Sequence, residues 1–369
     1  MKENILDYLA CPNRIGSKTC HNKLTVAEVF SYFKSRPAEI REGYLKCKAC
    51  SRRFPIFFGI PVLINNLPEY LRDNLYIILE LSERYGEIDK GLIVDSLSLA
   101  EQARPKDKKE LFSHNRGQYL RRIKAIFENN YIINHFDNFL SLAKPGEPLY
   151  DFLRKYRNKT PHLILEEFLN SHSNSKVQLA LEIGCNVGGF LLNLSQKARF
   201  IFGLDNSFEH LFFASCLLKH LPIKIKQYNI IIEAGIKKRR CLNIEVIANL
   251  TLIAAEGDNL PFRDSSLSIV SSCNLIDVID NPRGLLQEKM RVLKKSGLIL
   301  SSDPYQFLNE NKKKLGIKRG QTPWQRIQQI LEPEIKILAE RDYIPWITYG
   351  YRRNYTVYYN HCFCGMKVN

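Results

Sequence analysis

The chain has 369 residues, of which 45% are hydrophobic and 25% are charged, and it carries a formal net charge of +16. A chain of this length holds two domains, or one large domain with a small one attached, and its composition is that of a globular protein. No apolar run is long enough to span a bilayer, and the first residues, MKENILDYLACP, lack the apolar segment of a secretory signal. We therefore expect a cytoplasmic protein, not a membrane protein, whose ten cysteines are thiols or metal ligands.

The positive charge has two interpretations. An excess of lysine and arginine favours a polyanionic partner such as RNA. The same excess arises when lysine covers solvated faces and binds nothing. The basic residues are scattered along the chain, and their densest cluster is KKRR at residues 237–240. Charge alone therefore leaves RNA open as a partner.

Residues 1–66 contain a candidate metal site. Cys47 and Cys50, in LKCKACSRR, form half of a zinc-knuckle pattern. Upstream, Arg14 stands where the pattern would place another cysteine, and the next candidate ligands lie several residues further on. A structural zinc needs four nitrogen or sulfur ligands, so the intervening loop has to fold back. The predicted ligands are Cys11, Cys20, Cys47 and Cys50, with His21 as an alternative to Cys20; the other interpretation is a site that has lost its metal.

Residues 67–174 read as a mostly helical connector or lid. Leu120, Ile123 and Phe127 recur at helical spacing in YLRRIKAIFENNY. The polar stretch NSHSNSK at residues 170–176 then reads as a loop before the next unit.

Residues 175–369 alternate short apolar strands with helices, which predicts a parallel α/β sheet. KVQLALEIGCNVGGFLLNLSQ contains a buried strand, a glycine turn and an amphipathic helix. A second strand then ends in Asp205, so the pattern predicts a ribose-binding crossover. Asn186 replaces the second glycine of the dinucleotide fingerprint, which argues for a ligand without a pyrophosphate.

These residues resemble the class I S-adenosylmethionine-dependent methyltransferase family. Its first motif, E-x-G-x-x-x-G, is met by Glu182, Gly184 and Gly188, and further motifs follow in order to about residue 305. The resemblance implies a Rossmann-like seven-stranded sheet and S-adenosylmethionine as cofactor. The implied cofactor-binding residues are Glu182, Gly184, Cys185, Asn186, Gly188, Asp205, Asn206, Asp258, Asn259 and Asn274.

The front of the chain resembles a second family, the small zinc-ribbon proteins that activate RNA and protein methyltransferases. The resemblance rests on ILDYLACP, on the C-x-x-C pair and on the tail FPIFFGIPVLI. It implies an accessory ribbon with a structural zinc, fused to the catalytic domain. We therefore expect a zinc-ribbon-like domain at 1–66, a helical connector at 67–174 and a methyltransferase domain at 175–369.

The acceptor is less constrained by the sequence. Asp277, Asp303 and Tyr305 are candidate catalytic residues near the ends of the fourth and fifth strands, although each carboxylate equally suits a helix cap or turn. The Asn-Pro-Pro-Tyr motif of base-modifying N-methyltransferases is absent after the fourth strand. We expect a small-molecule or peptide acceptor; the alternatives are an rRNA or tRNA methyltransferase and a non-catalytic cofactor-binding module. The oligomeric state stays open.

Overall fold

The computed structural model describes residues 1–16, 18–103, 131–136, 143, 145–147, 149–156, 159–173, 175–233, 235–351 and 353–368. The helix predicted from Leu120, Ile123 and Phe127 lies outside these residues.

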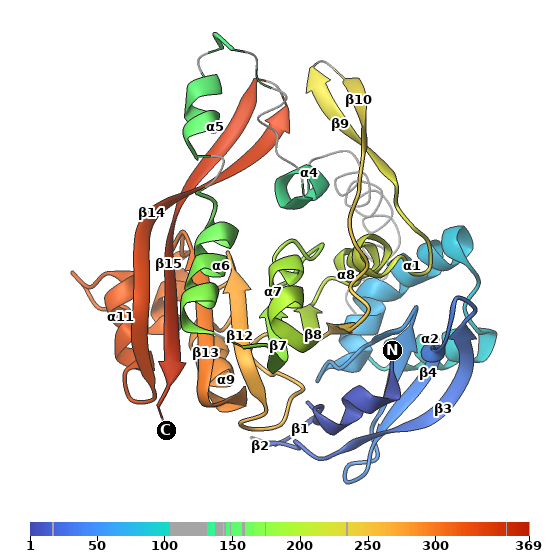
Figure 1. Cartoon of the computed structure of the whole chain (residues 1–369). Coiled ribbons are helices and arrows are strands. Elements are labelled where there is room, and N and C mark those ends of the chain that lie inside the picture. The colour runs from blue at the N-terminus through green and yellow to red at the C-terminus, as the bar shows by residue number, and fades with distance from the viewer. Residues whose placement is uncertain are drawn as a thin grey trace.

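The centre of the molecule is a seven-stranded sheet with the order β11-β8-β7-β12-β13-β15-β14 (Figure 1). The first five strands in this order pair in parallel, and β15 runs antiparallel to both of its neighbours. The predicted Rossmann-like seven-stranded sheet is therefore confirmed. Its strands are β7 (Val177–Ile183), β8 (Ala198–Asp205), β11 (Leu250–Ala254), β12 (Leu267–Cys273), β13 (Leu293–Asp303), β14 (Ile335–Tyr351) and β15 (Asn354–Lys367).

Both faces of this sheet are covered by helices, because the side chains of each strand alternate between two apolar cores. In β7, Leu179 and Leu181 belong to one core and Ala180 to the other. The described helices that pack on the sheet or beside it are α6 (Pro161–His172), α7 (Leu191–Lys197), α8 (Phe208–Ala214) with its π-helical extension η3 (Ser215–Lys219), α9 (Pro282–Val292), α10 (Asn309–Leu315) and α11 (Pro323–Leu331).

The N-terminal residues form a second, four-stranded antiparallel sheet with the order β3-β4-β5-β6. It extends the central sheet, because Val62 bridges Ala254 of β11 in parallel and the Leu63 amide donates to the Ala254 carbonyl at 2.8 Å. The β11 edge of the central sheet is thereby partly covered by the N-terminal sheet. The elements are η1 (Glu3–Asp7), β1 (Arg14–Ile15), β2 (Lys18–Thr19), β3 (Leu24–Phe33), β4 (Arg36–Cys47), β5 (Arg53–Phe57) and β6 (Ile60–Pro61).

The described part of the connector is helical, as predicted: α1 (Leu67–Tyr85), α2 (Lys90–Glu101), α4 (Tyr131–Phe136), α5 (Tyr150–Tyr156) and α6. α1 packs on α8, where Tyr85 and Phe212 lie 5.3 Å apart between ring centroids. α6 instead packs against β13, β14 and β15. The predicted boundary at residue 174 stays a prediction; α6, which precedes it, already belongs to the packing of the large sheet.

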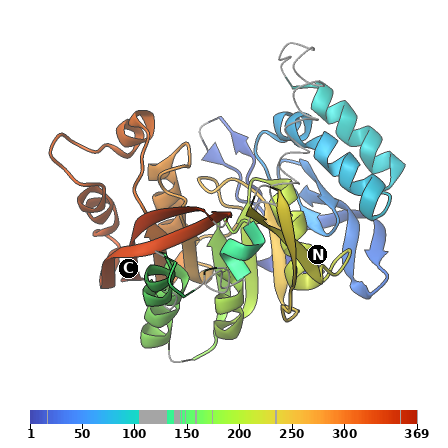
Figure 2. The ribbon, with the colours of Figure 1, turned by 90° about the horizontal axis from the view of Figure 1, so that it is seen from above.

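Two hairpins rise from the edge of the central sheet at which its parallel strands end. One is the far half of the long β14–β15 pair, and the other is β9 (Gln227–Glu233) with β10 (Ile236–Cys241), inserted between β8 and β11. Figures 1 and 2 show α4 between them. The Tyr349 hydroxyl donates to the Ile231 carbonyl at 2.8 Å, and the Tyr349 amide donates to Asn134 Oδ1 at 2.8 Å. The two hairpins and α4 therefore form a connected roof.

Among the helices in the described part of the chain, none combines the length and the apolar character needed to cross a membrane.

Candidate functional site

The four cysteines predicted as metal ligands lie together. Their sulfur atoms are all within 4.8 Å of one another, with Cys11 and Cys50 at 3.6 Å and Cys20 and Cys47 at 3.7 Å. A tetrahedron with zinc–sulfur bonds of about 2.3 Å has sulfur–sulfur edges of about 3.8 Å. The spacing of the four thiols therefore fits a tetrahedral thiophilic ion such as zinc.

The long first loop folds back, and this is how a cysteine beyond Arg14 reaches the cluster. β1 and β2 form a tight hairpin, after which the Cys20 amide donates to the Asn13 carbonyl at 2.8 Å. Cys20, and not His21, thus stands beside the other three cysteines. Arg14 instead contacts the large domain, where its guanidinium lies 3.4 Å from the carbonyl oxygen of Asp258.

The same loop also contacts the large domain through Asn259. The side-chain Nδ2 of Asn259 donates to the Pro12 carbonyl at 2.8 Å, and its Oδ1 accepts from the Thr19 hydroxyl at 3.3 Å. Asn259, predicted to bind cofactor, thus has both ends of its side-chain amide engaged by the loop between Cys11 and Cys20. Asp258 accepts a hydrogen bond from Asn281 at 3.1 Å. Neither residue lines the cavity described next, and their assignment to the cofactor stays a prediction.

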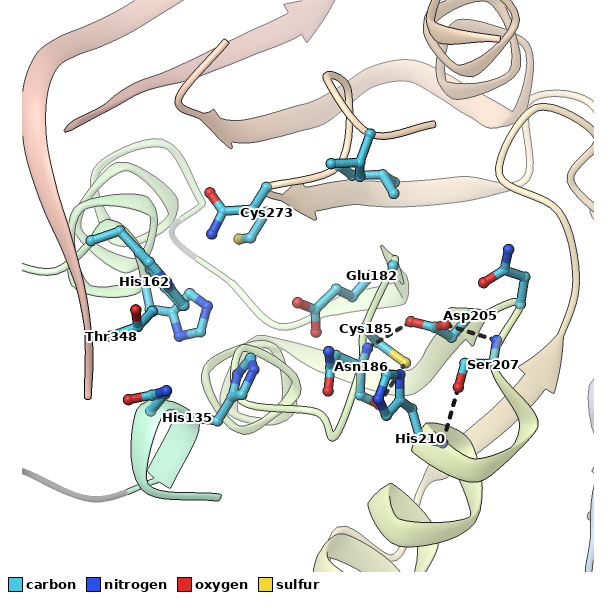
Figure 3. Close-up of a pocket in the computed structure, with 17 residues that line it drawn as sticks. His135, His162, Glu182, Cys185, Asn186, Asp205, Ser207, His210, Cys273 and Thr348 are labelled. Carbon is cyan, nitrogen blue, oxygen red and sulfur yellow. Dashed lines mark hydrogen bonds between the residues drawn. The ribbon is translucent and has the colours of Figure 1, made fainter. Parts of the chain in front are cut away.

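A cavity of about 390 Å³ lies where β7, β8 and β12 end, under the roof (Figure 3). These strands end at the same edge because they run in parallel, so their last side chains converge. The other walls come from α4, α6 and β14. Of the predicted cofactor residues, the following line it: Glu182, Gly184, Cys185, Asn186, Asp205, Asn206 and Asn274.

The glycine turn shapes one wall of the cavity. Gly184 has φ of +69° and Asn186 has φ of +49°, a left-handed conformation that asparagine tolerates better than most residues. Asp205 holds this turn, because its carboxylate accepts the Asn186 amide at 2.9 Å and the Ser207 amide at 2.9 Å. Gly188 lies behind the wall, where an added Cβ would lie 2.4 Å from the Leu218 side chain.

Glu182 places an unsatisfied carboxyl group in the cavity. Its side chain is 3% exposed, and its Oε2 atom is buried with no hydrogen-bond partner among the described residues. Burial, with a smaller contribution from the Asp205 charge, raises the pKa of Glu182 well above its usual value. Such a group is stabilised by a ligand that brings a positive charge or a hydrogen-bond donor.

The three predicted catalytic residues lie outside the cavity lining. Asp303 accepts the amides of Leu275 and Ile276 at 2.8 and 3.0 Å, and burial raises its pKa to about 6. Asp277 accepts the Gln306 amide at 2.7 Å, and the Tyr305 hydroxyl lies 3.1 Å from His361 Nδ1. Both carboxylates therefore hold the backbone of the loops after β12 and β13. Their catalytic assignment stays a prediction.

The wall opposite Asp205 is aromatic, and the sequence analysis missed it. His135 on α4, His162 on α6 and Trp346 on β14 all line the cavity. They come from three elements far apart in the chain, so no motif or period connects them. In the structure Gly189, the second glycine of VGGF, has no positive φ that would require glycine, and a Cβ there would lie 2.6 Å from His135 Nδ1.

Residues 181–301 match the model of a family described as a methyltransferase domain. The chain contains an S-adenosylmethionine-dependent methyltransferase domain. This match contains the last three residues of β7, all of β8, β11 and β12, and β13 up to Ser301, and therefore the strand ends around the cavity. A search of the curated proteins found no match.

Several solved structures are similar to the part of the chain that holds the methyltransferase domain. The YcgJ protein from Bacillus subtilis is 15% identical, covers 56% of this chain and 99% of its own, and has a TM-score of 0.38. A SAM-dependent methyltransferase from Aquifex aeolicus is 15% identical, with coverages of 57% and 93% and a TM-score of 0.36. A complex of a methyltransferase activator and a putative methyltransferase from Haloferax volcanii is 15% identical, covers 58% of this chain and 92% of its own, and has a TM-score of 0.37. At these identities the similarity says nothing about the acceptor.

The residues around the cavity fit the cofactor of the methyltransferase domain. S-adenosylmethionine carries an ammonium and a sulfonium, and the unsatisfied Oε2 of Glu182 needs a donor or a cation of this kind. The cofactor supplies a methyl group on a positively charged sulfur. Glu182 and Asp205 would hold its polar groups, and the Gly184 turn leaves room for close backbone approach.

Cofactor binding should release a proton from Glu182. Because its pKa is raised in the free protein, the carboxyl is protonated between the usual pKa of glutamate and the raised value. A bound cation favours the charged form, so the pKa falls, a proton leaves and affinity rises with pH across that window. Calorimetry with S-adenosylhomocysteine, in buffers of different ionisation enthalpy, measures this release. Glu182→Gln should abolish it; an equal release in that variant would assign the proton elsewhere.

Proposed function

We propose that this chain transfers the methyl group of S-adenosylmethionine to a small-molecule acceptor. The observation that supports a small acceptor is the cavity of about 390 Å³ under the roof of α4 and the two hairpins. This volume is near the lower end of the usual range for small-molecule sites, about 300–1,000 Å³. A cavity that must also hold the cofactor leaves room for one compact group rather than for a polymer segment.

The chain's own contribution to this reaction is positioning. Methyl transfer is an in-line displacement in which the acceptor's lone pair forms the new bond and the sulfur keeps the electron pair of the broken one. Fixing both partners in one cavity accounts for much of the acceleration in such reactions. The turn that Asp205 holds forms one wall of this cavity. Where the acceptor's nucleophilic atom carries a proton, that proton passes to solvent.

Two incubations test this function directly. The purified protein, given cofactor labelled in its methyl group, should transfer the label to the small-molecule fraction of a cell extract, detected by mass spectrometry. The same protein should leave the RNA and protein fractions unlabelled. Label in the RNA fraction would instead establish the second candidate function, methylation of rRNA or tRNA.

The observation that favours this second candidate is the basic hairpin. Lys237, Lys238 and Arg239 on β10 are exposed, and β10 forms part of the roof above the cavity. An RNA bound there would have its phosphates near the site. The exposed tyrosines of the other hairpin, Tyr351, Tyr358 and Tyr359, offer faces on which bases stack.

We expect weak RNA binding. Changing residues 237–240 together to alanine should leave the affinity for S-adenosylhomocysteine unchanged, because the four side chains do not line the cavity. Filter binding of tRNA over a range of salt concentrations is the measurement. Tight binding that weakens steeply with salt and is lost in the quadruple variant would favour RNA, since neutralised phosphates release counterions. A variant with Lys312, Lys313, Lys314 and Lys318 changed to alanine removes the same number of positive charges and controls for net charge.

We further infer that the cysteine cluster holds one zinc ion in a structural role, because four thiolates leave no open position for a substrate. All ten cysteines are free thiols in the described structure, which suits a reducing compartment such as the cytoplasm. The ribbon then supports the large domain through its contacts with Asp258 and Asn259.

A further inference from the structure

We propose that the aromatic wall formed by His135, His162 and Trp346 is the acceptor subsite, and that it selects a flat aromatic molecule bearing an O–H or N–H group. This inference rests on the proposed methyltransferase function and names its substrate class. All three side chains line the cavity, and Figure 3 shows His135 and His162 on the side away from Asp205, with Glu182 between them.

The rings are arranged to accept another ring. His162 lies edge-on to Trp346 with 4.9 Å between centroids, and 5.5 Å from Phe190 behind it. His135 lies 6.0 Å from both His162 and Trp346. Centroid distances of 4.5–7 Å are those of favourable aromatic pairs. A flat ligand entering beside them continues this cluster, whereas a saturated ring of the same size loses the stacking geometry.

The wall carries hydrogen-bonding nitrogen but no charge. Burial lowers the pKa of His135 to about 4 and that of His162 to about 3. Both imidazoles are therefore neutral near pH 7, so they do not repel a cationic cofactor in the same cavity. A neutral imidazole has one nitrogen that accepts a hydrogen bond, which suits an acceptor whose nucleophilic atom carries a proton.

The structure also keeps space for the two imidazoles. At Gly189, an added Cβ would lie 2.6 Å from His135 Nδ1 and 3.1 Å from His162 Cε1. Its nearest neighbours are thus the two histidines of the wall. The position of the wall is further fixed by hydrogen bonds, since Asn134 beside His135 accepts the Tyr349 amide of β14. The space at Gly189 and the Asn134–Tyr349 hydrogen bond both hold the two imidazoles in place, as expected for a ligand subsite.

The test compares three probes of similar size on protein saturated with S-adenosylhomocysteine: phenol, which is flat with an O–H; toluene, which is flat without one; and cyclohexanol, which has an O–H but is not flat. Ligand-observed NMR gives the three affinities. We expect phenol to bind at least tenfold more tightly than either other probe. Equal binding of the three, or preference for cyclohexanol, would overturn the proposal.

Variants assign the effect to the wall. Trp346→Leu should weaken phenol and toluene together, and His162→Phe should remove the advantage of phenol over toluene while keeping a ring in place. Gly189→Ala should weaken all ring binding. The matched controls are Trp324→Leu, which alters the other tryptophan of the chain, and His172→Phe, at an exposed position on the same helix as His162. If the controls change phenol binding as much as the wall variants, the assignment is wrong.

The outcomes separate this inference from the proposed function. Calorimetry of the wild-type protein with S-adenosylhomocysteine comes first, and absent binding there defeats the proposed function. Normal cofactor binding with no selectivity among the three probes defeats only the acceptor subsite. Because the probe comparison uses the wild-type chain, it stays decisive even where a variant fails to fold.

Discussion

Replacing Asp205 by alanine should lower the affinity for S-adenosylhomocysteine by about 10- to 100-fold. A hydrogen bond to a charged group contributes roughly 1.5–3 kcal/mol, and each 1.4 kcal/mol is a factor of ten. In the structure, the carboxylate also holds the glycine turn through Asn186 and the start of α8 through Ser207. The variant therefore loses both a ligand contact and the shape of the turn, and calorimetry measures the sum.

The conservative variant Asp205→Asn separates the two effects. Its side-chain amide keeps one of the two oxygens that accept the Asn186 and Ser207 amides, and it loses the charge. If Asp205 binds the ligand, Asp205→Asn should fall between the wild type and Asp205→Ala. Affinity unchanged in both variants would mean that Asp205 neither binds the ligand nor is needed to keep the turn in its binding shape. Asp264→Ala, an exposed aspartate at the surface, serves as the control for loss of one negative charge.

Removal of the metal should destabilise the whole protein, not only its front. Elemental analysis should find about one zinc per chain, as for a closed four-ligand site. Cys11 and Cys47 belong to the same apolar core as Phe262 and Leu181 of the large domain. Structural zinc binds with roughly 10–16 kcal/mol, so losing it should cost several kcal/mol and lower Tm by on the order of ten degrees.

Calorimetric unfolding of Cys47→Ser, with metal content measured on the same sample, is the test. Cys241→Ser is the matched control, because Cys241 is exposed and lies outside the cluster. A single cooperative transition that shifts as a whole would support a shared core. Two transitions, of which only the one with the smaller enthalpy changes its midpoint temperature, would show that the ribbon unfolds by itself. Zinc near zero in protein purified without chelators would mean that the site holds no metal.

The sequence alone predicted the sheet and brought together the residues from Glu182 to Asp205 that line one side of the cavity, because their signals are local. A buried strand, a glycine turn and an acid at the end of the next strand lie within about two dozen residues, Glu182 to Asp205. Parallel strands bring such ends to one edge whatever the rest of the chain does. The cysteine cluster was also readable, since a tetrahedral ion constrains which thiols approach one another, even though Arg14 interrupts the usual spacing.

Only the tertiary structure decided which polar residues face the cavity and which hold backbone. Asp303 and Asn259 have the residue type and position of site residues, yet Asp303 accepts two backbone amides and Asn259 contacts the loop between Cys11 and Cys20. A carboxylate or an amide satisfies a backbone group as well as a ligand, and sequence does not say which is nearer. His162 and Trp346 meet because α6 and β14, far apart in the chain, pack together, and packing over such distances leaves no periodic trace in the sequence.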